Sequence, residues 1–227
     1  MKQINLKKNY LLIITSLFLS FNLFSQEKAF IKGKVVISGS ASLGVYATKT
    51  HTEWNYYSLH KSTDTTDGAA SGVYALNLEY GLTNWLGIGG RFGYSKYVTQ
   101  ADSSNNYIKP NVHGWDGDLT LNFHFVKTKH FDMPLQLAFG YSHVKYQALN
   151  ASNGIAEGGG LNYGISLVPR IYFGNHIGMF FNVGYAGYNY PNLVLSDNSG
   201  IYNTLNYTFK LKANGFNLGI GLVAKFL

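Results

Sequence analysis

Apolar residues alternate with small or polar residues along most of this chain of 227 residues. The pattern is clearest in GFNLGIGLVAKFL, residues 215–227, where Phe216, Leu218 and Ile220 are separated by glycine and asparagine. A period of two is that of a β-strand whose two faces have different surroundings. The second face is mostly glycine and amide, which suits a crowded interior better than a solvated surface. We therefore expect the apolar face to point outward, into lipid.

Seven earlier segments repeat this alternation, so the sequence predicts eight strands. They are Val36–Ala47, Gly72–Gly81, Trp85–Tyr97, His113–Phe125, Pro134–Tyr146, Gly160–Phe173, Ile177–Tyr188 and an eighth whose lower half is 215–227. Charged residues within these segments fall on the small face. The predicted interior is therefore polar and the predicted exterior apolar.

The connections between the predicted strands alternate in length. Those near Leu82–Asn84, Val126–Met133 and Gly174–His176 are short, and the others are long and polar. Short turns at one end, long loops at the other and an even strand number are typical of an all-β, antiparallel up-and-down transmembrane barrel. Closure is required, because an open sheet edge in lipid would leave backbone groups unpaired.

Composition agrees with this fold class. The chain has 26 Gly, 18 Tyr and 15 Phe, no Cys, and only 13% charged residues. Outward aromatic residues gather at both ends of the predicted strands, as in interfacial girdles. Near the long loops these are Tyr74, Tyr94, Trp115, Tyr141, Tyr163 and Tyr185, and near the short turns Tyr80, Phe125, Phe173 and Phe226.

The first residues predict a cleaved signal peptide, 1–25, before a single barrel domain, 26–227. A lysine-rich start is followed by the apolar run Tyr10–Phe24 and by Ser25, a small residue at a plausible cleavage point. The alternative, a membrane anchor, needs an apolar run of about 20 residues. Loss of the three lysines lowers the formal charge from +7 to +4, and an exported chain of that charge is not expected to bind nucleic acid.

In this arrangement the chain resembles the small outer-membrane barrels of the OmpA-domain, OmpX and OmpW-like group. The resemblance covers residues 30–227 and includes the final Lys225-Phe226-Leu227, which is similar to that group's barrel-assembly signal, although Phe226 is penultimate rather than last. It implies insertion by the barrel-assembly machinery into the bacterial outer membrane, with periplasmic N- and C-termini. The partners it implies are outer-membrane lipid, lipopolysaccharide or a larger outer-membrane protein complex.

Motifs of catalysis and cofactor binding are missing from the sequence. The glycine-rich segment 87–93, GIGGRFG, has Phe92 where a nucleotide-binding loop needs its third glycine, so it indicates close packing in a narrow barrel. His51 and His60 share one connection, but zinc needs three or four ligands. The His-x-Ser pair of lipid A deacylases does not occur. We therefore predict no enzyme activity, no metal and no cofactor.

Charged residues on the inward face form the strongest constellation. They are Glu79, Arg91, Asp116, Asp118, Arg170 and Lys225. One interpretation is an ion path, and the other is a salt-bridged plug, which the narrow interior of eight strands favours. A pair between Arg91 and Glu79 is within diagonal reach across one hairpin.

Two outer regions could bind ligands. The first long loop, 49–61, carries Trp54, Tyr56 and Tyr57 beside amides and histidines, which suits a sugar, a lipid headgroup or a protein, or else extends the girdle. The rim residues expected to contact lipopolysaccharide phosphates are Lys96, Lys145, Lys210 and Lys212.

The favoured function is a non-enzymatic structural or surface-interaction role. The alternatives are a small porin or transporter for an ionic or hydrophobic solute and, third, a lipid A-modifying enzyme. The sequence names no ligand.

Overall fold

A computed structural model describes residues 28–226 except 57–58, 99–110, 148–153 and 197–206. The predicted signal peptide lies outside this part. The described residues form nine strands: β1 (Val35–Tyr56), β2 (Leu59–Gly81), β3 (Leu86–Val98), β4 (Asn111–Lys127), β5 (Phe131–Gln147), β6 (Ile155–Leu167), β7 (Arg170–Tyr172), β8 (Ile177–Ser196) and β9 (Tyr207–Phe226). No helix in the described part is long and apolar enough to cross a membrane.

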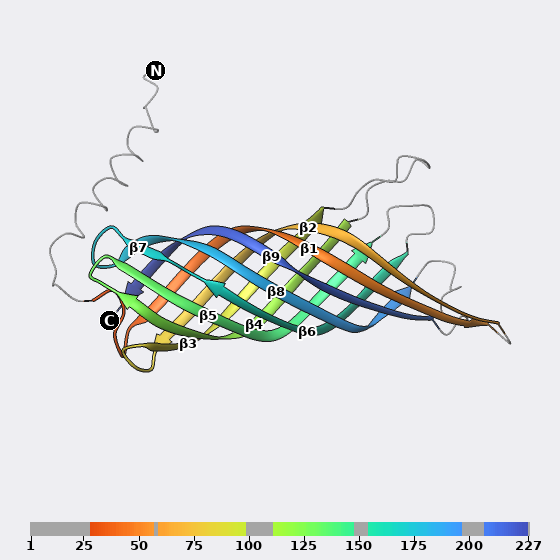
Figure 1. The fold of residues 1–227 in the computed structure, drawn as a ribbon, viewed down its shortest axis with the longest axis horizontal. Coiled ribbons are helices and arrows are strands. Elements are labelled where there is room, and N and C mark those ends of the chain that lie inside the picture. Colours follow the sequence, from red (N-terminus) through yellow and green to blue (C-terminus); the bar gives the residue numbers. More distant parts are fainter. Residues whose placement is uncertain (1–27, 57–58, 99–110, 148–153, 197–206, 227) are drawn as a thin grey trace, which may run out of the picture.

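The strands close into one antiparallel barrel (Figure 1). Strands that are neighbours in sequence pair with each other, except β6 and β7, and β1 closes the ring by pairing with β9 along most of its length. The short β7 continues the position of β6, since both pair with β5 and β8. The ring therefore has eight positions, and the predicted eight-stranded barrel is confirmed.

The predicted continuous strand Gly160–Phe173 is wrong in detail. Val168 and Pro169 separate β6 from β7. Pro169 has no N–H to donate to the ladder, and the strand is interrupted at this position. The carbonyl of Pro169 still accepts a hydrogen bond from the N–H of Phe181 at 3.0 Å, which keeps β7 in place beside β8.

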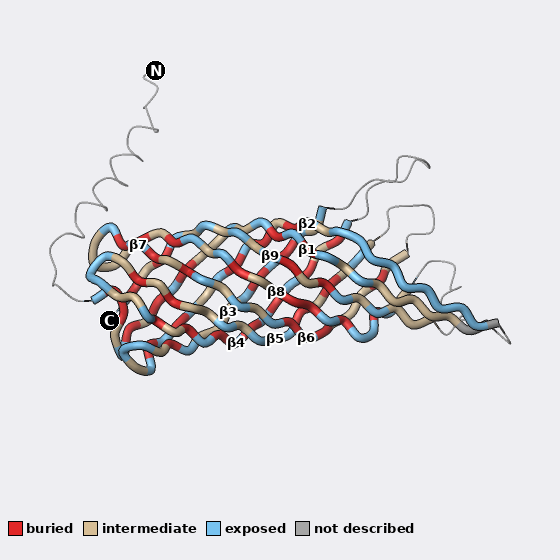
Figure 2. Tube along the Cα trace, viewed as in Figure 1, coloured by how far each residue is buried: buried red, intermediate tan, exposed pale blue. Residues whose placement is uncertain are grey.

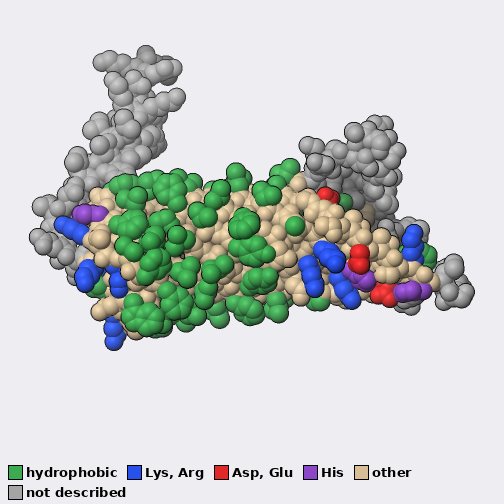
Figure 3. All heavy atoms as spheres, in the orientation of Figure 1, with side chains coloured by type: hydrophobic (Ala, Val, Ile, Leu, Met, Phe, Trp, Pro, Cys, Tyr) green, Lys and Arg blue, Asp and Glu red, His purple; other side chains and the backbone are tan. Residues whose placement is uncertain are grey.

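The alternating residues of each strand point in turn into the lumen and onto the outer wall of the barrel. Buried and exposed residues follow one another along the strands (Figure 2), and apolar side chains cover the middle of the wall, with charged groups toward the ends (Figure 3). Leu43 and Leu119 are each 73% exposed. So many exposed apolar side chains in one belt fit a barrel wall that faces lipid.

Aromatic side chains stand on this wall at both ends, as predicted. Those exposed near the long connections are Tyr74, Tyr94, Trp115, Tyr141 and Tyr163, and those near the short turns are Tyr80, Trp85, Phe125, Phe173 and Phe226. Tyr185 is half-buried, and its ring packs edge-on against Phe216 at 5.3 Å.

The expectation of a loop at residues 49–61 is wrong for the part that is described. β1 and β2 pair without a register break from Val35↔Tyr80 to Tyr56↔Leu59. The hairpin projects beyond the other strands in Figure 1. Its upper part is polar but rich in threonine, a β-branched residue that favours strands. Composition therefore indicated a loop where backbone preference gives a strand.

An N-terminal segment, residues 28–34, crosses the short-turn end of the barrel. The N–H of Ala29 donates to the carbonyl of Thr128, and the N–H of Gly33 donates to that of Gly81, both at 2.8 Å. Gly33 has a φ of 84°, which glycine adopts without strain. Phe30 is 1% exposed, and its ring stacks on the His124 imidazole with centroids 3.4 Å apart.

Substitution Phe30→Ala should therefore destabilise the barrel. We expect a loss of about 3–5 kcal/mol in the free energy of unfolding, because a buried ring is removed and a cavity remains. The measurement is urea unfolding in lipid vesicles, followed by tryptophan fluorescence. Phe92→Ala is the matched control, since Phe92 is 57% exposed on the outer wall. Equal losses of unfolding free energy in the two variants would show that packing of Phe30 inside the barrel does not stabilise it.

Candidate functional site

The lumen at the short-turn end contains four charged side chains from four strands, the buried quartet Glu79, His124, Asp132 and Arg170. His124 Nε2 lies 2.6 Å from Glu79 Oε1, and its Nδ1 lies 2.8 Å from Asp132 Oδ1. Arg170 Nη2 is 2.7 Å from Glu79 Oε2, and its Nη1 is 3.5 Å from Asp132 Oδ2. Each of the four is at most 4% exposed.

The hydrogen bonds of His124 constrain the protonation of the quartet, and Arg170 Nη1 has no hydrogen-bond partner among the described residues. Both ring nitrogens of His124 face carboxylate oxygens, and an ionised carboxylate can only accept a hydrogen bond. With Glu79 and Asp132 ionised, both nitrogens must therefore carry hydrogen, which makes His124 an imidazolium. The quartet then contains two anions and two cations, and its net charge is zero. Substitution of Gly87 by any larger residue would place a Cβ against Oε1 of Glu79, so the glycine-rich segment leaves room for the quartet.

A second ion pair lies farther along the lumen. Arg91 and Asp118 are direct register partners on β3 and β4, and Arg91 Nη1 is 2.6 Å from Asp118 Oδ2. Asn162 donates to the other Asp118 oxygen at 2.7 Å. The expected pair of Arg91 with Glu79 is wrong, because Glu79 lies opposite Gly89 and reaches toward the short turns, where Arg170 and His124 lie.

The remaining predicted lumen residues have different surroundings. Asp116 is fully buried; the hydroxyl of Tyr188 donates to its Oδ2 at 3.5 Å, and its Oδ1 has no hydrogen-bond partner among the described residues. Lys225 Nζ lies 4.2 Å from the centroid of the Tyr172 ring, a cation–π distance. The six predicted residues thus occupy several levels of the lumen rather than one site.

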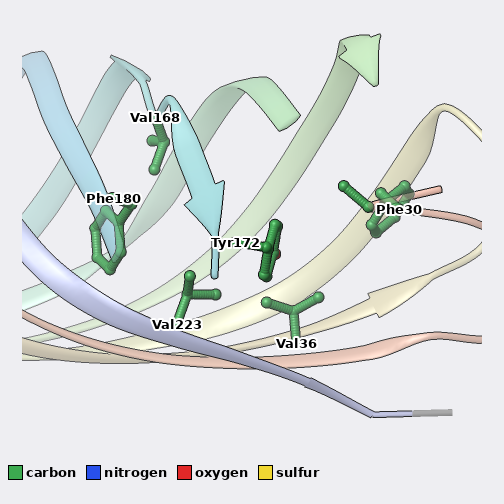
Figure 4. Packing of buried hydrophobic residues seen from close by; sticks show 7 residues of the cluster. Phe30, Val36, Val168, Tyr172, Phe180 and Val223 are labelled. Atoms are coloured by element: carbon green, nitrogen blue, oxygen red, sulfur yellow. The ribbon is translucent and has the colours of Figure 1, made fainter. Parts of the chain in front are cut away.

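Apolar side chains close the lumen on both sides of these polar groups. At the short-turn end, Figure 4 shows Phe30, Val36 and Tyr172 in one buried cluster. At the other end, Tyr46, Tyr188 and Leu193 belong to a second buried cluster. β8 has a register shift between Tyr190 and Leu193, both 2% exposed, at this position.

A small polar cavity lies between the two clusters. Its volume is about 50 Å³, and its lining includes Arg91, Asp118 and Asn162. Since one water needs about 10–15 Å³ by this measure, the cavity has room for a few waters. Asn182 Oδ1 and Asn162 Oδ1 lack other partners within the described residues and could accept hydrogen bonds from such waters.

The projecting hairpin carries a separate polar group on its outer face. His51 Nδ1 is 2.8 Å from Asp64 Oδ1, and Glu53 lies between His51 and His60, 3.8 and 3.7 Å from their Nε2 atoms. The hydrogen bond from His51 holds the pKa of Asp64 below its usual value. In the described ranges, no group of three or more His, Cys, Asp or Glu side chains is arranged to hold a metal ion.

The predicted ligand-binding aromatics are only partly visible. Trp54 is half-buried on the hairpin, opposite Lys61 on β2 and Tyr207 on β9. Tyr57 and the side chain of Tyr56 lie outside the described part of the structure.

The four predicted rim lysines do not form one cluster. Lys210 and Lys212 are exposed on β9, and Lys49 on β1 is the register partner of Lys212. Lys145 lies 3.3 Å from Glu157 and forms an ion pair with it. Lys96 is exposed on β3, away from β1 and β9.

Two members of the quartet were not among the predicted site residues. His124 lies on the inward face of a predicted strand, which was the available signal. Asp132 falls in a segment predicted as a turn, Val126–Met133, whereas β5 begins at Phe131. Phe30 precedes the first predicted strand and gave no periodic signal.

Comparison with known proteins identifies the fold. No protein-family model and no curated protein matches this sequence. The outer membrane protein OprG from Pseudomonas aeruginosa superposes with a TM-score of 0.54 over 87% of this chain and 97% of its own, at 13% identity. The chain has the fold of a small outer-membrane β-barrel. The outer membrane protease OmpT from Escherichia coli, with a TM-score of 0.48 and 12% identity, is matched over 84% of this chain and 97% of its own.

Within this outer-membrane barrel, Arg170→Met should be strongly destabilising. We expect a loss of about 3–5 kcal/mol, because Glu79 and Asp132 would share a single cation in a buried site. Arg91→Met is the matched control and should cost less, since the Arg91 side chain is 22% exposed to the cavity. Urea unfolding in lipid vesicles measures both. Adding Glu79→Gln to Arg170→Met should recover part of the lost stability. Equal losses of stability in Arg170→Met and Arg91→Met would contradict the ion pairing described for the quartet.

Proposed function

We propose that this chain is a non-enzymatic protein of the bacterial outer membrane that acts through its outer surface, as a structural or interaction protein. The observation that carries the proposal is the filled lumen, with buried charged groups in its middle and apolar clusters on either side. A solute path needs a continuous polar space, and here the polar space is a cavity of about 50 Å³. The short-turn end and both termini face the periplasm in this proposal.

If the lumen is filled, the barrel should not conduct ions. The purified barrel in a planar bilayer should show no steady current, because movement of ions would require breaking the buried quartet and displacing both apolar clusters. Insertion is verified in parallel by protease protection of the strands in vesicles made from the same preparation. A steady, ion-selective current from the unmodified protein would favour the porin alternative and overturn this proposal.

On the outer rim, the proposed ligand is the phosphate of lipopolysaccharide. Lys49 and Lys212 are directly opposed on neighbouring strands, with Lys210 two register pairs farther out, opposite His51. Like charges in opposed positions destabilise a sheet, so a bridging anion would stabilise this end of the barrel. The exposed Val45 and Phe216, paired on the same strands, place the lysines just beyond the apolar wall.

The combined change Lys49→Gln, Lys210→Gln and Lys212→Gln should lower lipopolysaccharide retention at least tenfold. Each lysine contact contributes about 1 kcal/mol at an anionic surface, and about 1.4 kcal/mol corresponds to a factor of ten. The measurement is lipopolysaccharide phosphate that co-purifies per barrel in mild detergent. Lys145→Gln, whose lysine already pairs with Glu157, is the control and should change little. Equal retention by the triple variant would mean that these lysines only solubilise the rim.

The projecting hairpin is the proposed contact for an extracellular ligand or a partner membrane protein. Trp54, the register partner of Lys61, offers a flat ring on the opposite face of the hairpin from His51, and such a ring suits a polar ligand with an apolar face. Phe226, exposed at the end of β9, is the proposed contact for the barrel-assembly machinery during insertion.

A further inference from the structure

Four lysines lie together at the short-turn end, and we call them the basic collar: Lys28, Lys32, Lys127 and Lys129. Two come from the N-terminal segment and two flank Thr128 in the turn between β4 and β5. Lys28, Lys32 and Lys129 are exposed, and Lys127 is half-buried. Blue side chains gather at this end of the barrel in Figure 3.

Hydrogen bonds hold the members of the collar near one another. The N–H of Ala29 donates to the carbonyl of Thr128 at 2.8 Å, which places Lys28 beside the turn that carries Lys127 and Lys129. The N–H of Lys32 donates to Asn84 Oδ1 at 3.0 Å, and the ammonium of Lys127 donates to the carbonyl of Asn84. The four backbone positions are therefore fixed around two turns.

No acidic side chain balances the collar in the part of the chain that is described. The described carboxylates nearest to it, Glu79 and Asp132, are buried and paired inside the quartet, which is itself neutral. The other described carboxylates lie farther along the lumen or near the long connections. The long-connection end differs, since Lys145 pairs there with Glu157.

Exposed apolar residues lie directly beside the collar. Leu82 and Trp85 flank Asn84 in the turn between β2 and β3, and Phe125 is two residues from Lys127. These side chains are 41%, 54% and 56% exposed, respectively, and belong to the end of the lipid-facing wall. Lysine stems run along apolar surface while their ammonium groups reach the polar boundary, where lipid headgroups lie.

We propose that the basic collar binds the phosphate groups of anionic phospholipids in the leaflet next to the short-turn end. The partner is a lipid rather than a soluble acidic protein because the lysines adjoin the edge of the apolar wall. Several lysines near one anionic surface bind it cooperatively through summed electrostatic attraction, which salt screens. This site is distinct from the rim of Lys49, Lys210 and Lys212, and it requires only that the barrel spans a bilayer.

Trp85 provides a reporter within the site. In a full-chain variant with Trp54→Phe and Trp115→Phe, the remaining tryptophan lies beside the collar. This protein is reconstituted in bilayers containing equal small fractions of headgroup-nitroxide lipid, either phosphatidylglycerol or phosphatidylcholine. At low salt we expect the phosphatidylglycerol quencher to be about fivefold enriched near Trp85 relative to the phosphatidylcholine quencher. This factor corresponds to the free energy of a single lysine contact with an anionic surface. The enrichment should disappear in 1 M salt.

Substitution tests whether the lysines cause the enrichment. Lys28→Gln, Lys32→Gln and Lys129→Gln together should abolish it, whereas the same three changes to Arg should preserve it. Lys127 stays in place because it donates to Asn84. A second reporter protein, with Trp54→Phe and Trp85→Phe, retains Trp115 near the opposite end, and its quenching should be unchanged by the triple Gln substitution. Equal quenching by the two lipids at Trp85, or a preference that survives the Gln substitutions, would overturn the proposal.

Discussion

Complete pairing of the backbone is the constraint on which the rest of this structure depends. A chain surrounded by lipid has no water to satisfy its N–H and C=O groups, so a sheet must close on itself. Here β1 pairs on both sides along nearly its whole length, with β2 and with β9. Closure with eight strands leaves an interior only wide enough for side chains. The inward residues must therefore fit one another, and the outward residues must be apolar.

The polar filling of the lumen follows from this narrowness together with the period of two. The buried quartet joins β2, β4, β5 and β7, so a slip of one residue in any of these strands would turn a charged group toward lipid. Burying ions carries a desolvation cost, and ion pairing offsets this cost without adding much net stability. The arrangement therefore favours one register over its neighbours, while the apolar clusters at both ends contribute packing and exclude water.

The sequence predicted what is local and missed what depends on the closure geometry. Alternation over each segment identified the strands and the facing of Glu79, Arg91 and Arg170, because side-chain direction follows residue parity. The partners of Arg91 and Glu79 depend on the shear of the barrel, and shear is a property of all the strands together. The threonine-rich upper part of the β1–β2 hairpin was predicted as a loop because it is polar. Phe30 lies in the lumen but belongs to no segment with a period of two.

The two ends of the barrel differ in how their charges are balanced, and this difference is the reason for the proposal that the protein acts through its surface. At the long-connection end, carboxylates are paired locally: His51 pairs with Asp64 on the projecting hairpin, and Lys145 on β5 pairs with Glu157 on β6. The lysines of β1 and β9 therefore retain their charge above an apolar wall. At the short-turn end the described carboxylates are withdrawn into the quartet, where Arg170 and His124 neutralise them. The exposed lysines there are left without counter-charges from the described residues. A barrel whose buried quartet is neutral thus presents cations at both ends of its apolar wall, and this is why anionic groups of the surrounding membrane are the proposed partners.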